Sequence, residues 1–330
     1  MTPSFDLDVV VTRGDAVESR HRVCAAVVDG DQLIGQARDP HLVSYWRSAA
    51  KPFQLIPLME SGQLDQLGWG SDEIALASAS HGGEPEHVAI AERMLSDLDL
   101  EEGDLACGVQ EPLSQRGARL LRESGGRPTR LHNNCSGKHA AMLARAQLSG
   151  WPTQGYERAD HPVHTSIFKT MEQWTGLSIG QMTLGVDGCG VVVFAMPLDA
   201  MARAYTRLIQ AAQQGNHTPK RIVGAMLEQP FLIGGTDRFD SVLMEESGGR
   251  VLCKIGAEGI HCASIVDSGV SVALKVEDGA LRAQYPALLY LLQQLGALPA
   301  ELPPRLAEFM RKPVRNTRNE VVGQITVAAA

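Results

Sequence analysis

A serine and a lysine three residues apart, Ser48 and Lys51, are the pair in this chain whose types and spacing most directly suggest chemistry. Side chains three residues apart lie on the same face of a helix. A lysine amine that burial or a nearby positive charge keeps neutral accepts the proton of a serine hydroxyl, and the hydroxyl then acts as a nucleophile. The pair predicts acyl transfer; the simpler alternative is a helix-capping serine followed by an ordinary lysine.

The same spacing occurs a second time, at Ser166 and Lys169. These two residues lie inside the segment 164–174, whose mixture of polar and apolar positions is typical of a surface helix. We therefore interpret Lys169 as an exposed lysine on a solvated helix face.

The surroundings of Ser48 are different. The serine follows an extended stretch, 42–47, and it precedes Pro52, which fits only the first turn of a helix. Residues 53–59 are nearly all apolar, as in a buried helix. Ser48 is thus predicted to stand where an extended segment enters a buried helix.

Two short loops carry thiols beside other metal-binding residue types. The segment 132–139 reads His-Asn-Asn-Cys-Ser-Gly-Lys-His and leads into a helix, and the segment 187–190 reads Asp-Gly-Cys-Gly between strand-like runs. Thiolate and nitrogen ligands favour zinc, so one interpretation is that Cys135 and Cys189 converge on one cation. A cysteine nucleophile paired with a nearby histidine is the other interpretation, and it ranks lower because the serine already fills that role.

A glycine-rich loop at 78–87 opens a further helix. Backbone amides at Gly82 and Gly83 are candidates for holding an oxyanion, and Ser80 is a candidate for relaying a proton. The two histidines of this loop are interpreted either as metal ligands or as exposed loop residues.

Two basic residues near the second half of the chain also have candidate roles. Lys254 ends a strand two residues before a glycine, which partly matches the Lys-Thr-Gly strand of serine β-lactamases, with Ile255 in place of the threonine. Arg238, within the segment 234–240, offers a guanidinium to a carboxylate, with a surface ion pair as the alternative.

Composition limits the partners. The chain has 330 residues, 44% of them hydrophobic, and a formal charge of −8. This balance argues against nucleic acid and anionic membrane surfaces and favours a small molecule. The N-terminus has no basic region followed by an apolar stretch of signal length, so we expect a cytoplasmic protein whose six cysteines are thiols.

The periodicity changes along the chain. Strand patterns occur near the N-terminus at 8–12, 23–28 and 33–36, and return at 186–196, 251–255, 261–267, 270–276 and 323–327. Helical patterns occur at 87–98, 117–124, 138–148, 164–174, 199–214, 219–229 and 286–295.

This order predicts an α/β protein of the α+β kind, with one antiparallel sheet built from both chain ends and an inserted helical subdomain. We expect a single domain over 1–330, with 1–47 and 186–330 bearing the sheet and 48–185 mostly helical. Penicillin-binding proteins and serine β-lactamases share this layout, and their reactive serine also begins a helix after the first strands.

Six segments in order resemble the L-asparaginase II family, the serine-dependent, zinc-binding asparaginases. The most specific is 132–139, and the others are 46–54, 80–84, 187–190, 235–240 and 254–259. The resemblance covers nearly the whole chain. It implies a β-lactamase-like fold, a homodimer, and hydrolysis of L-asparagine to L-aspartate and ammonia.

The resemblance also implies roles for individual residues. Ser48 would act with Lys51, supported by Ser80 and Lys254. Zinc would be held by the set Cys135, Lys138 and Cys189, with Asp187 close by. Chemistry alone favours His139 over Lys138 as the third ligand, because an amine must lose a proton before it coordinates. The substrate-binding residues expected from the resemblance are Arg47, on the substrate carboxylate, His139 and Asp187.

The resulting hypothesis is that Ser48 attacks the side-chain amide of asparagine, backbone amides hold the oxyanion, and water hydrolyses the aspartyl ester. The alternatives are a penicillin-recognising peptidase or esterase and a zinc-dependent amino-acid sensor without turnover. The cytoplasmic start and the absence of a Ser-x-Asn motif disfavour the first alternative.

Overall fold

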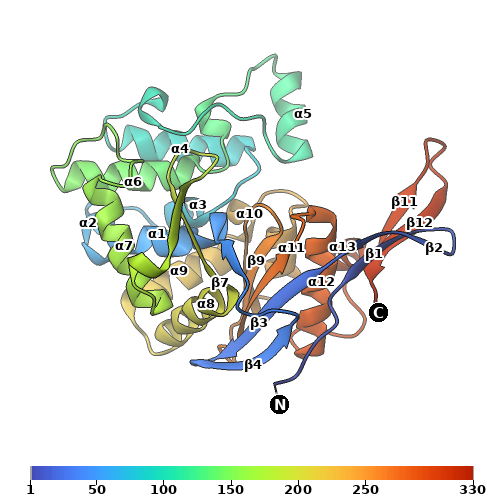
Figure 1. The fold of residues 1–330 in the computed structure, drawn as a ribbon. Coiled ribbons are helices and arrows are strands. Elements are labelled where there is room, and N and C mark those ends of the chain that lie inside the picture. Colours follow the sequence, from blue (N-terminus) through green and yellow to red (C-terminus); the bar gives the residue numbers. More distant parts are fainter. Residues whose placement is uncertain (1, 330) are drawn as a thin grey trace. The chain divides into compact units, whose positions relative to one another are not determined.

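Two compact units make up the protein in the computed structural model, which describes residues 2–329. The first unit contains the chain up to Ala49, the segment Met196–Arg207, and the chain from Val242 onward. The second unit contains Ala50–Ala195 and Leu208–Ser241. Most strands belong to the first unit and most helices to the second (Figure 1).

A five-stranded antiparallel sheet forms the centre of the first unit. Its strand order is β4-β3-β10-β9-β8. The bounds are β3 Val23–Asp29, β4 Gln32–Ala37, β8 Val251–Ile255, β9 Ile260–Ile265 and β10 Ser271–Val276. Gly30, at φ +56°, makes the tight turn of the β3–β4 hairpin. The sheet thus joins strands that lie more than two hundred residues apart in the sequence.

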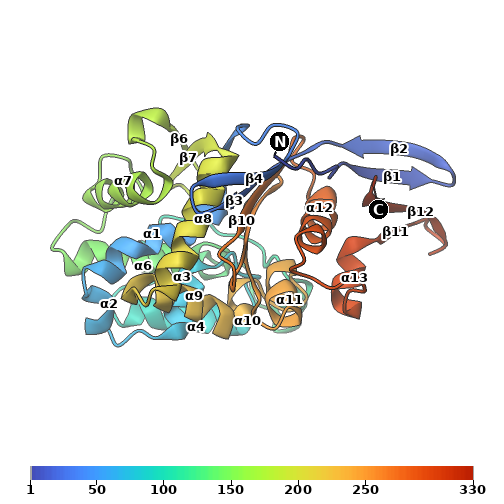
Figure 2. The same ribbon diagram turned by 90° about the horizontal axis from the view of Figure 1, so that it is seen from below.

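A separate four-stranded sheet, in the order β11-β12-β1-β2, pairs the two chain ends. The bounds are β1 Val9–Arg13, β2 Ala16–His21, β11 Lys312–Arg315 and β12 Val321–Val327. The prediction of a single sheet is therefore wrong, because β1 bonds to β2 and β12 while β3 bonds to β4 and β10, leaving neither strand an edge for the other. Figure 2 shows these strands extending past helices α12 and α13.

Helix α12, Leu281–Gln294, fills the core of the first unit. It packs against β9 and β10 of one sheet and against β1 and β12 of the other. Its apolar residues Leu288, Leu289 and Leu292 have no exposed surface. Helix α13, Pro304–Met310, packs on α12.

Helices dominate the second unit. They are α1 Lys51–Glu60, α2 Gln63–Gln66, α3 Ser71–Ser78, α4 Pro85–Ser96, α5 Gln115–Glu123, α6 Ser136–Leu148, α7 Pro162–Thr175, α9 His217–Glu228 and α10 Pro230–Ile233. The hairpin of β6 Thr183–Val186 and β7 Val192–Pro197 belongs to this unit as far as Ala195. Strand β5, Val43–Tyr45, precedes α1 and lies in the first unit. Helices α8, Leu198–Gln213, and α11, Phe239–Glu246, run across the division between the units.

Helix α1 is buried along nearly its whole length, as its apolar sequence predicts. Every residue from Lys51 to Met59 is buried. The helix packs against α3, α6 and α7. The predicted mixed α/β fold, with antiparallel strands from both chain ends around an inserted helical part, is confirmed. No helix within residues 2–329 is long and apolar enough to span a membrane.

The contact between α3 and α6 leaves no room for a side chain at Gly137. A Cβ at this position would lie 2.5 Å from the carbonyl oxygen of Leu76. Alanine usually stabilises a helix interior by about 1 kcal/mol relative to glycine. We expect Gly137→Ala instead to lower the free energy of unfolding by about 1–3 kcal/mol, because the backbone of α3 must move.

Urea unfolding midpoints test this expectation. The control is Gly180→Ala, because a Cβ there meets nothing within 4 Å. The control should change stability by less than about 0.5 kcal/mol. Equal midpoints for Gly137→Ala and the unsubstituted protein would contradict the close packing.

Candidate active site

Lys51, the first residue of α1, carries a buried amine that contacts three oxygens. Its side chain is 1% exposed. The Nζ atom donates to the carbonyl oxygens of Ala79, at 2.5 Å, and Asn134, at 3.2 Å, and to Ser80 Oγ at 3.1 Å. Lys51 is therefore within hydrogen-bond reach of one of the two predicted hydroxyl groups.

Ser48 lies one turn before Lys51 on the same helical segment. A 3₁₀ turn, Arg47–Ala50, leads directly into α1. Side chains three residues apart lie on one face of a continuous helical segment, so Ser48 and Lys51 share a face. Ser48 is half-buried, and Arg47 enters the turn in the left-handed region at φ +53°. The predicted passage from an extended segment into a buried helix is confirmed.

Lys254, on β8 of the first unit, is buried beside the segment that carries Ser48. It pairs across the sheet with Cys262, whose sulfur accepts a hydrogen bond from the indole of Trp46 at 3.3 Å. Gly256 is needed here, because a Cβ on it would lie 3.0 Å from the Trp46 carbonyl oxygen. Lys254 Nζ donates to the Ile255 carbonyl oxygen at 3.0 Å. Ser48 and Lys254 belong to the first unit, whereas Lys51 and Ser80 belong to the second.

The two histidines of the loop 78–87, called the Ser80 loop below, are buried and hydrogen-bonded within the protein. His81 and His87 have no exposed surface and stack with ring centroids 5.0 Å apart. His81 Nδ1 accepts from the Gly83 amide, and its Nε2 donates to Ser136 Oγ at 2.9 Å. His87 Nδ1 accepts from the Glu84 amide, and its Nε2 donates to the Phe231 carbonyl oxygen.

Two sequence interpretations of this loop are therefore wrong. The histidines are neither exposed nor available to a metal, because all four ring nitrogens already have protein partners. Burial, together with the charges of neighbouring groups, holds the pKa of His81 well below its usual value, so the ring is neutral. The Gly83 amide donates to His81, so it is not an oxyanion donor.

The two predicted thiol loops meet in the second unit. Cys135, Lys138 and Cys189 are all buried. Lys138 Nζ donates to Cys189 Sγ at 3.0 Å, and Cys135 is hydrogen-bonded to the same sulfur. Helix α6 begins at Ser136, which brings Lys138 into its first turn, and the turn between β6 and β7 presents Cys189.

These three groups strongly shift one another's protonation. The hydrogen bond with Cys135 and the charge of Lys138 lower the pKa of Cys189 to about 5, against the opposing effect of burial. The same hydrogen bond and burial raise the pKa of Cys135 to about 12. Burial would lower the pKa of Lys138, but Cys189, Cys135 and Asp187 raise it. At neutral pH the group is thus one thiolate, one thiol and one ammonium.

His139 and Asp187 are the predicted substrate-binding residues of this unit. They lie next in sequence to Lys138 and near Cys189, respectively, in the group formed by Cys135, Lys138 and Cys189, which is called the sulfur group below. His139 has no exposed surface, and its Nδ1 lies 2.7 Å from Tyr156 Oη. The Ala106 amide donates to Tyr156 Oη, and His139 Nδ1 is the acceptor within reach of the Tyr156 hydroxyl proton; with the proton assigned in this direction, the histidine carries its own proton on Nε2. This Nε2 has no partner among residues 2–329. Asp187 is half-buried in the β6–β7 turn, where its Oδ1 accepts from the Gly188 amide.

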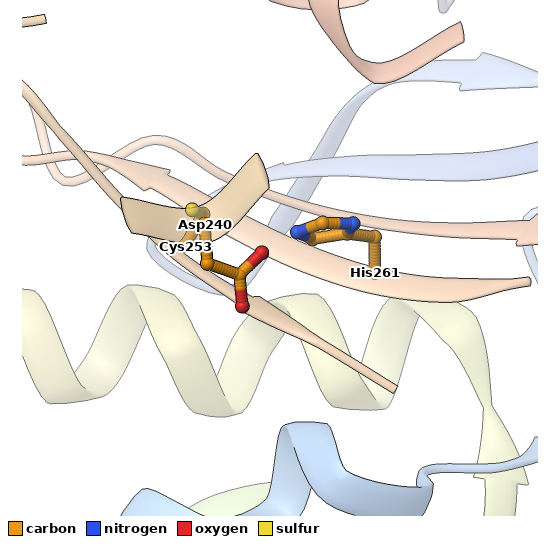
Figure 3. A group of neighbouring side chains, drawn as sticks. All are labelled: Asp240, Cys253 and His261. Carbon is orange, nitrogen blue, oxygen red and sulfur yellow. The ribbon is translucent and has the colours of Figure 1, made fainter. Parts of the chain in front are cut away.

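A further group of metal-binding residue types was not singled out from the sequence. Asp240, in the first turn of α11, Cys253 on β8 and His261 on β9 are buried, and one ligand atom of each lies within 4.8 Å of the others (Figure 3). His261 Nδ1 accepts from the amide of Gln284 at 3.2 Å, which leaves the ring proton on Nε2 and weakens His261 as a neutral ligand.

The sequence as a whole decides the family. A family model described as L-asparaginase II matches residues 9–327. The chain belongs to the L-asparaginase II family. No curated protein matches the chain. Family membership supports an amidohydrolase that acts on a small amide.

Solved structures that resemble this L-asparaginase II family member include glutaminases. One is a probable glutaminase from Bacillus subtilis complexed with 6-diazo-5-oxo-L-norleucine, with 11% identity, 84% of each chain covered and a TM-score of 0.40. Another is a Bacillus glutaminase in the presence of 4.3 M NaCl, with 14% identity, 84% of this chain and 91% of that chain covered, and a TM-score of 0.45. The family assignment rests on the sequence match alone.

Sequence reasoning did not find two partners of the site in this family member. Tyr156 fixes the ring of His139, and no motif surrounds it. Asn134 lies inside the segment 132–139, the most specific motif of the resemblance, so the sequence did mark this residue as a candidate for the site. Its carbonyl oxygen accepts from Lys51, and its Oδ1 lies 3.0 Å from Cys135 Sγ.

We expect the hydrogen bond with Cys135 to control the ionisation of Cys189 in the metal-free protein. Cys135→Ala removes this hydrogen bond, which is the largest contribution that lowers the pKa of Cys189. The pKa of Cys189 should therefore rise above about 5. The thiolate absorbance in the ultraviolet, followed against pH, measures this shift. Cys24→Ala is the control, since Cys24 lies in the first unit. An unchanged titration in Cys135→Ala would contradict the described contact.

Proposed function

We propose that this chain hydrolyses L-asparagine to L-aspartate and ammonia with Ser48 as nucleophile. The observation that carries the proposal is the buried amine of Lys51, one helical turn from Ser48 and 3.1 Å from Ser80 Oγ. Membership of the L-asparaginase II family supports the amide substrate.

In the first half of the proposed reaction, Lys51 acts as the neutral amine: its two hydrogens stay on the carbonyl oxygens of Ala79 and Asn134, and its lone pair takes the proton of the Ser48 hydroxyl. Ser48 Oγ attacks the carbon of the side-chain amide while backbone amides hold the oxyanion. The C–N bond then breaks, and ammonia leaves with a proton returned by a lysine. An aspartyl ester of Ser48 remains.

In the second half, water attacks the ester carbonyl, L-aspartate leaves, and the Ser48 hydroxyl is restored. Ser80 and Lys254 are proposed to support these proton transfers. The position of Ser80 on Lys51 Nζ supports its part, because a hydroxyl that both donates and accepts can pass a proton onward. Lys254 contributes a buried amine on β8.

Zinc is the cofactor that we propose for Cys135, Lys138 and Cys189. The donor set fits, because the Cys189 thiol has a lowered pKa and is a thiolate at neutral pH. The Cys135 sulfur and the Lys138 nitrogen lie beside it, and all three residues are buried. When bound, zinc supplies a positive charge that orients the substrate. The chain's own residues do the rest: His139 offers its Nε2 proton, Asp187 a carboxylate, and Arg47 a guanidinium for the substrate carboxylate.

Two further expectations belong to this proposal. The family resemblance implies a homodimer, and the N-terminal sequence favours the cytoplasm. Neither is needed for the chemistry of Ser48.

The mechanism makes a matched prediction for the two Ser-x-x-Lys segments. Ser48→Ala should reduce ammonia release from L-asparagine by about a thousand-fold or more, because the nucleophile is lost. Ser166→Ala should keep full activity, because Ser166 Oγ donates to the Val163 carbonyl oxygen and Lys169 is exposed, as expected for a surface helix.

Ammonia release is measured with L-asparagine and, in parallel, with L-glutamine. The unfolding midpoints of both variants should equal that of the unsubstituted protein. If a folded Ser48→Ala variant releases ammonia from L-asparagine at an unchanged rate, the proposed mechanism is wrong. A rate on L-glutamine alone would correct the substrate.

The protonation states predict how zinc binding depends on pH. Cys189 is already a thiolate above about pH 5, whereas Cys135 and Lys138 must each lose a proton on binding. Two protons are released per zinc, so the affinity should rise about 100-fold per pH unit near neutrality. Chelator competition at several pH values measures the slope.

Substitutions separate the contributions. Lys138→Met should lower the slope to one proton, and both Cys135→Ala and Cys189→Ala should abolish stoichiometric zinc by elemental analysis. Cys24→Ala is the matched control and should retain it. Stoichiometric zinc in the Cys135 and Cys189 variants would exclude this site.

A further inference from the structure

A surface cavity of about 720 Å³ lies in the second unit, where the last turn of α1 meets helices α6 and α7. Its volume is within the range of small-molecule pockets, about 300–1,000 Å³. All of its lining residues belong to the segment Ala50–Ala195. None of them is a residue proposed for catalysis, substrate binding or zinc binding. The charged side chains of the lining are Arg145 on α6, Lys169 on α7 and Glu60 on α1.

Arg145 brings a half-buried positive charge to this cavity. Its guanidinium carbon lies 4.8 Å from the ring centroid of Trp151, which also lines the cavity. Nη1 donates to Gln63 Oε1 at 2.6 Å and to Ser149 Oγ at 2.8 Å. These contacts hold the guanidinium in place. Neither Nε nor Nη2 has a hydrogen-bond partner among residues 2–329, and no carboxylate of this range pairs with the guanidinium.

Glu60 carries the opposite charge at an unfavourable position. It is the last residue of α1, where the helix dipole disfavours a carboxylate, and the last turn contains no basic residue. Partial burial raises the pKa of Glu60. Within the described chain, the Glu60 carboxylate forms no hydrogen bond or ion pair. A cationic group supplied by a ligand, such as an ammonium, would stabilise this carboxylate.

Lys169 completes the set of charges in the cavity. It is exposed on α7, and its amine has no ion-pair partner in the part of the chain that the structure describes. The lining therefore carries two positive charges and one negative charge. The positive charges of Arg145 and Lys169 do not shift the pKa of Glu60, so the opposite charges are not paired with each other. A ligand with two anionic groups and one cationic group would satisfy all three side chains.

We propose that this cavity binds a small amino dicarboxylate, with its carboxylates on Arg145 and Lys169 and its ammonium on Glu60. L-Aspartate and L-glutamate have this charge pattern at neutral pH. Arg145 Nη2 is the guanidinium group that remains for a charge-assisted hydrogen bond to a carboxylate, and Trp151 supplies an apolar wall for the methylene carbons. The inference does not rest on asparagine hydrolysis, because it uses none of the residues proposed for that reaction.

The proposed site is separate from the reacting groups. Glu60 and Lys51 stand at opposite ends of α1, which places their backbones about 14 Å apart along the helix axis. One L-aspartate molecule is too short to reach both. The chain would therefore bind L-aspartate twice, once as the proposed product and once in this cavity.

Binding stoichiometry gives the first test. Equilibrium dialysis with radiolabelled L-aspartate counts the ligand bound per chain. The unsubstituted protein should bind two and Arg145→Gln one, because loss of a half-buried charge weakens this site about 30-fold or more. If the proposed function is wrong, the counts become one and none, and the loss of one ligand still supports this inference. Equal counts with equal Kd values in both proteins overturn it.

Ligand chemistry gives the second test. Succinate lacks only the amino group of L-aspartate. Glu60→Gln should weaken the Arg145-dependent binding of L-aspartate about three-fold or more, and it should not weaken that of succinate. Inorganic phosphate, an anion without an ammonium, should displace L-aspartate poorly from the unsubstituted protein. If phosphate or succinate displaces L-aspartate as well as L-glutamate does, the assignment to an amino dicarboxylate is overturned.

Further variants control for charge and folding. Arg119→Ala removes an exposed positive charge on α5, outside the cavity, and should bind L-aspartate as the unsubstituted protein does. Urea unfolding midpoints verify that each variant folds. Lys169→Met, at an exposed position, replaces Arg145→Gln if that variant does not fold, and should weaken the same ligand about three-fold or more. Unchanged binding in both Lys169→Met and Glu60→Gln overturns the proposed site.

Discussion

The buried amine of Lys51 is the interaction on which the arrangement of the site depends. Its three oxygen partners come from the end of α3 and from the segment before α6, so helix α1 and these two segments must meet at one point. An amine taken out of water without such partners would be strongly destabilising. The same requirement that satisfies the amine therefore places Ser80 beside it. Ser48 is then placed by the chain itself, one turn earlier on the helical segment that Lys51 continues.

Asn134 connects this amine to the sulfur group. Its carbonyl oxygen faces Lys51, its side-chain oxygen faces Cys135, and α6 follows with Lys138 in its first turn. Gly137 packs against the backbone of Leu76, and this contact fixes the position of the first turn of α6 on α3. Proton transfer and proposed metal binding thus rest on adjacent residues of one short motif. On the other side of Ser80, the buried carboxylate of Glu84 accepts hydrogen bonds from the amide and hydroxyl of Thr236, which hold the loop 234–238.

The sequence predicted what local patterns encode. Helices α4, α6, α7, α8 and α9 begin and end within about two residues of their predicted bounds. The sequence did not predict how the strands pair. The alternation of polar and apolar residues in β1 and β3 shows that each is a strand, but not which neighbouring strand each one bonds to. Burial of His81 and His87 was missed for a related reason, since their partners at Ser136 and Phe231 are distant in sequence. Chemistry alone preferred His139 to Lys138 as a ligand, yet Lys138 is the side chain in contact with Cys189, and His139 turns to Tyr156.

The central claim is that Ser48 carries the acyl group. A diazo ketone analogue of L-asparagine, which traps a nucleophile that attacks the side-chain carbonyl, tests it most directly. After incubation with the protein and proteolysis, mass spectrometry locates the modified residue. The account predicts one label per chain, on the Ser48 hydroxyl, prevented by excess L-aspartate. A label on Cys135, or on any residue other than Ser48, would contradict it.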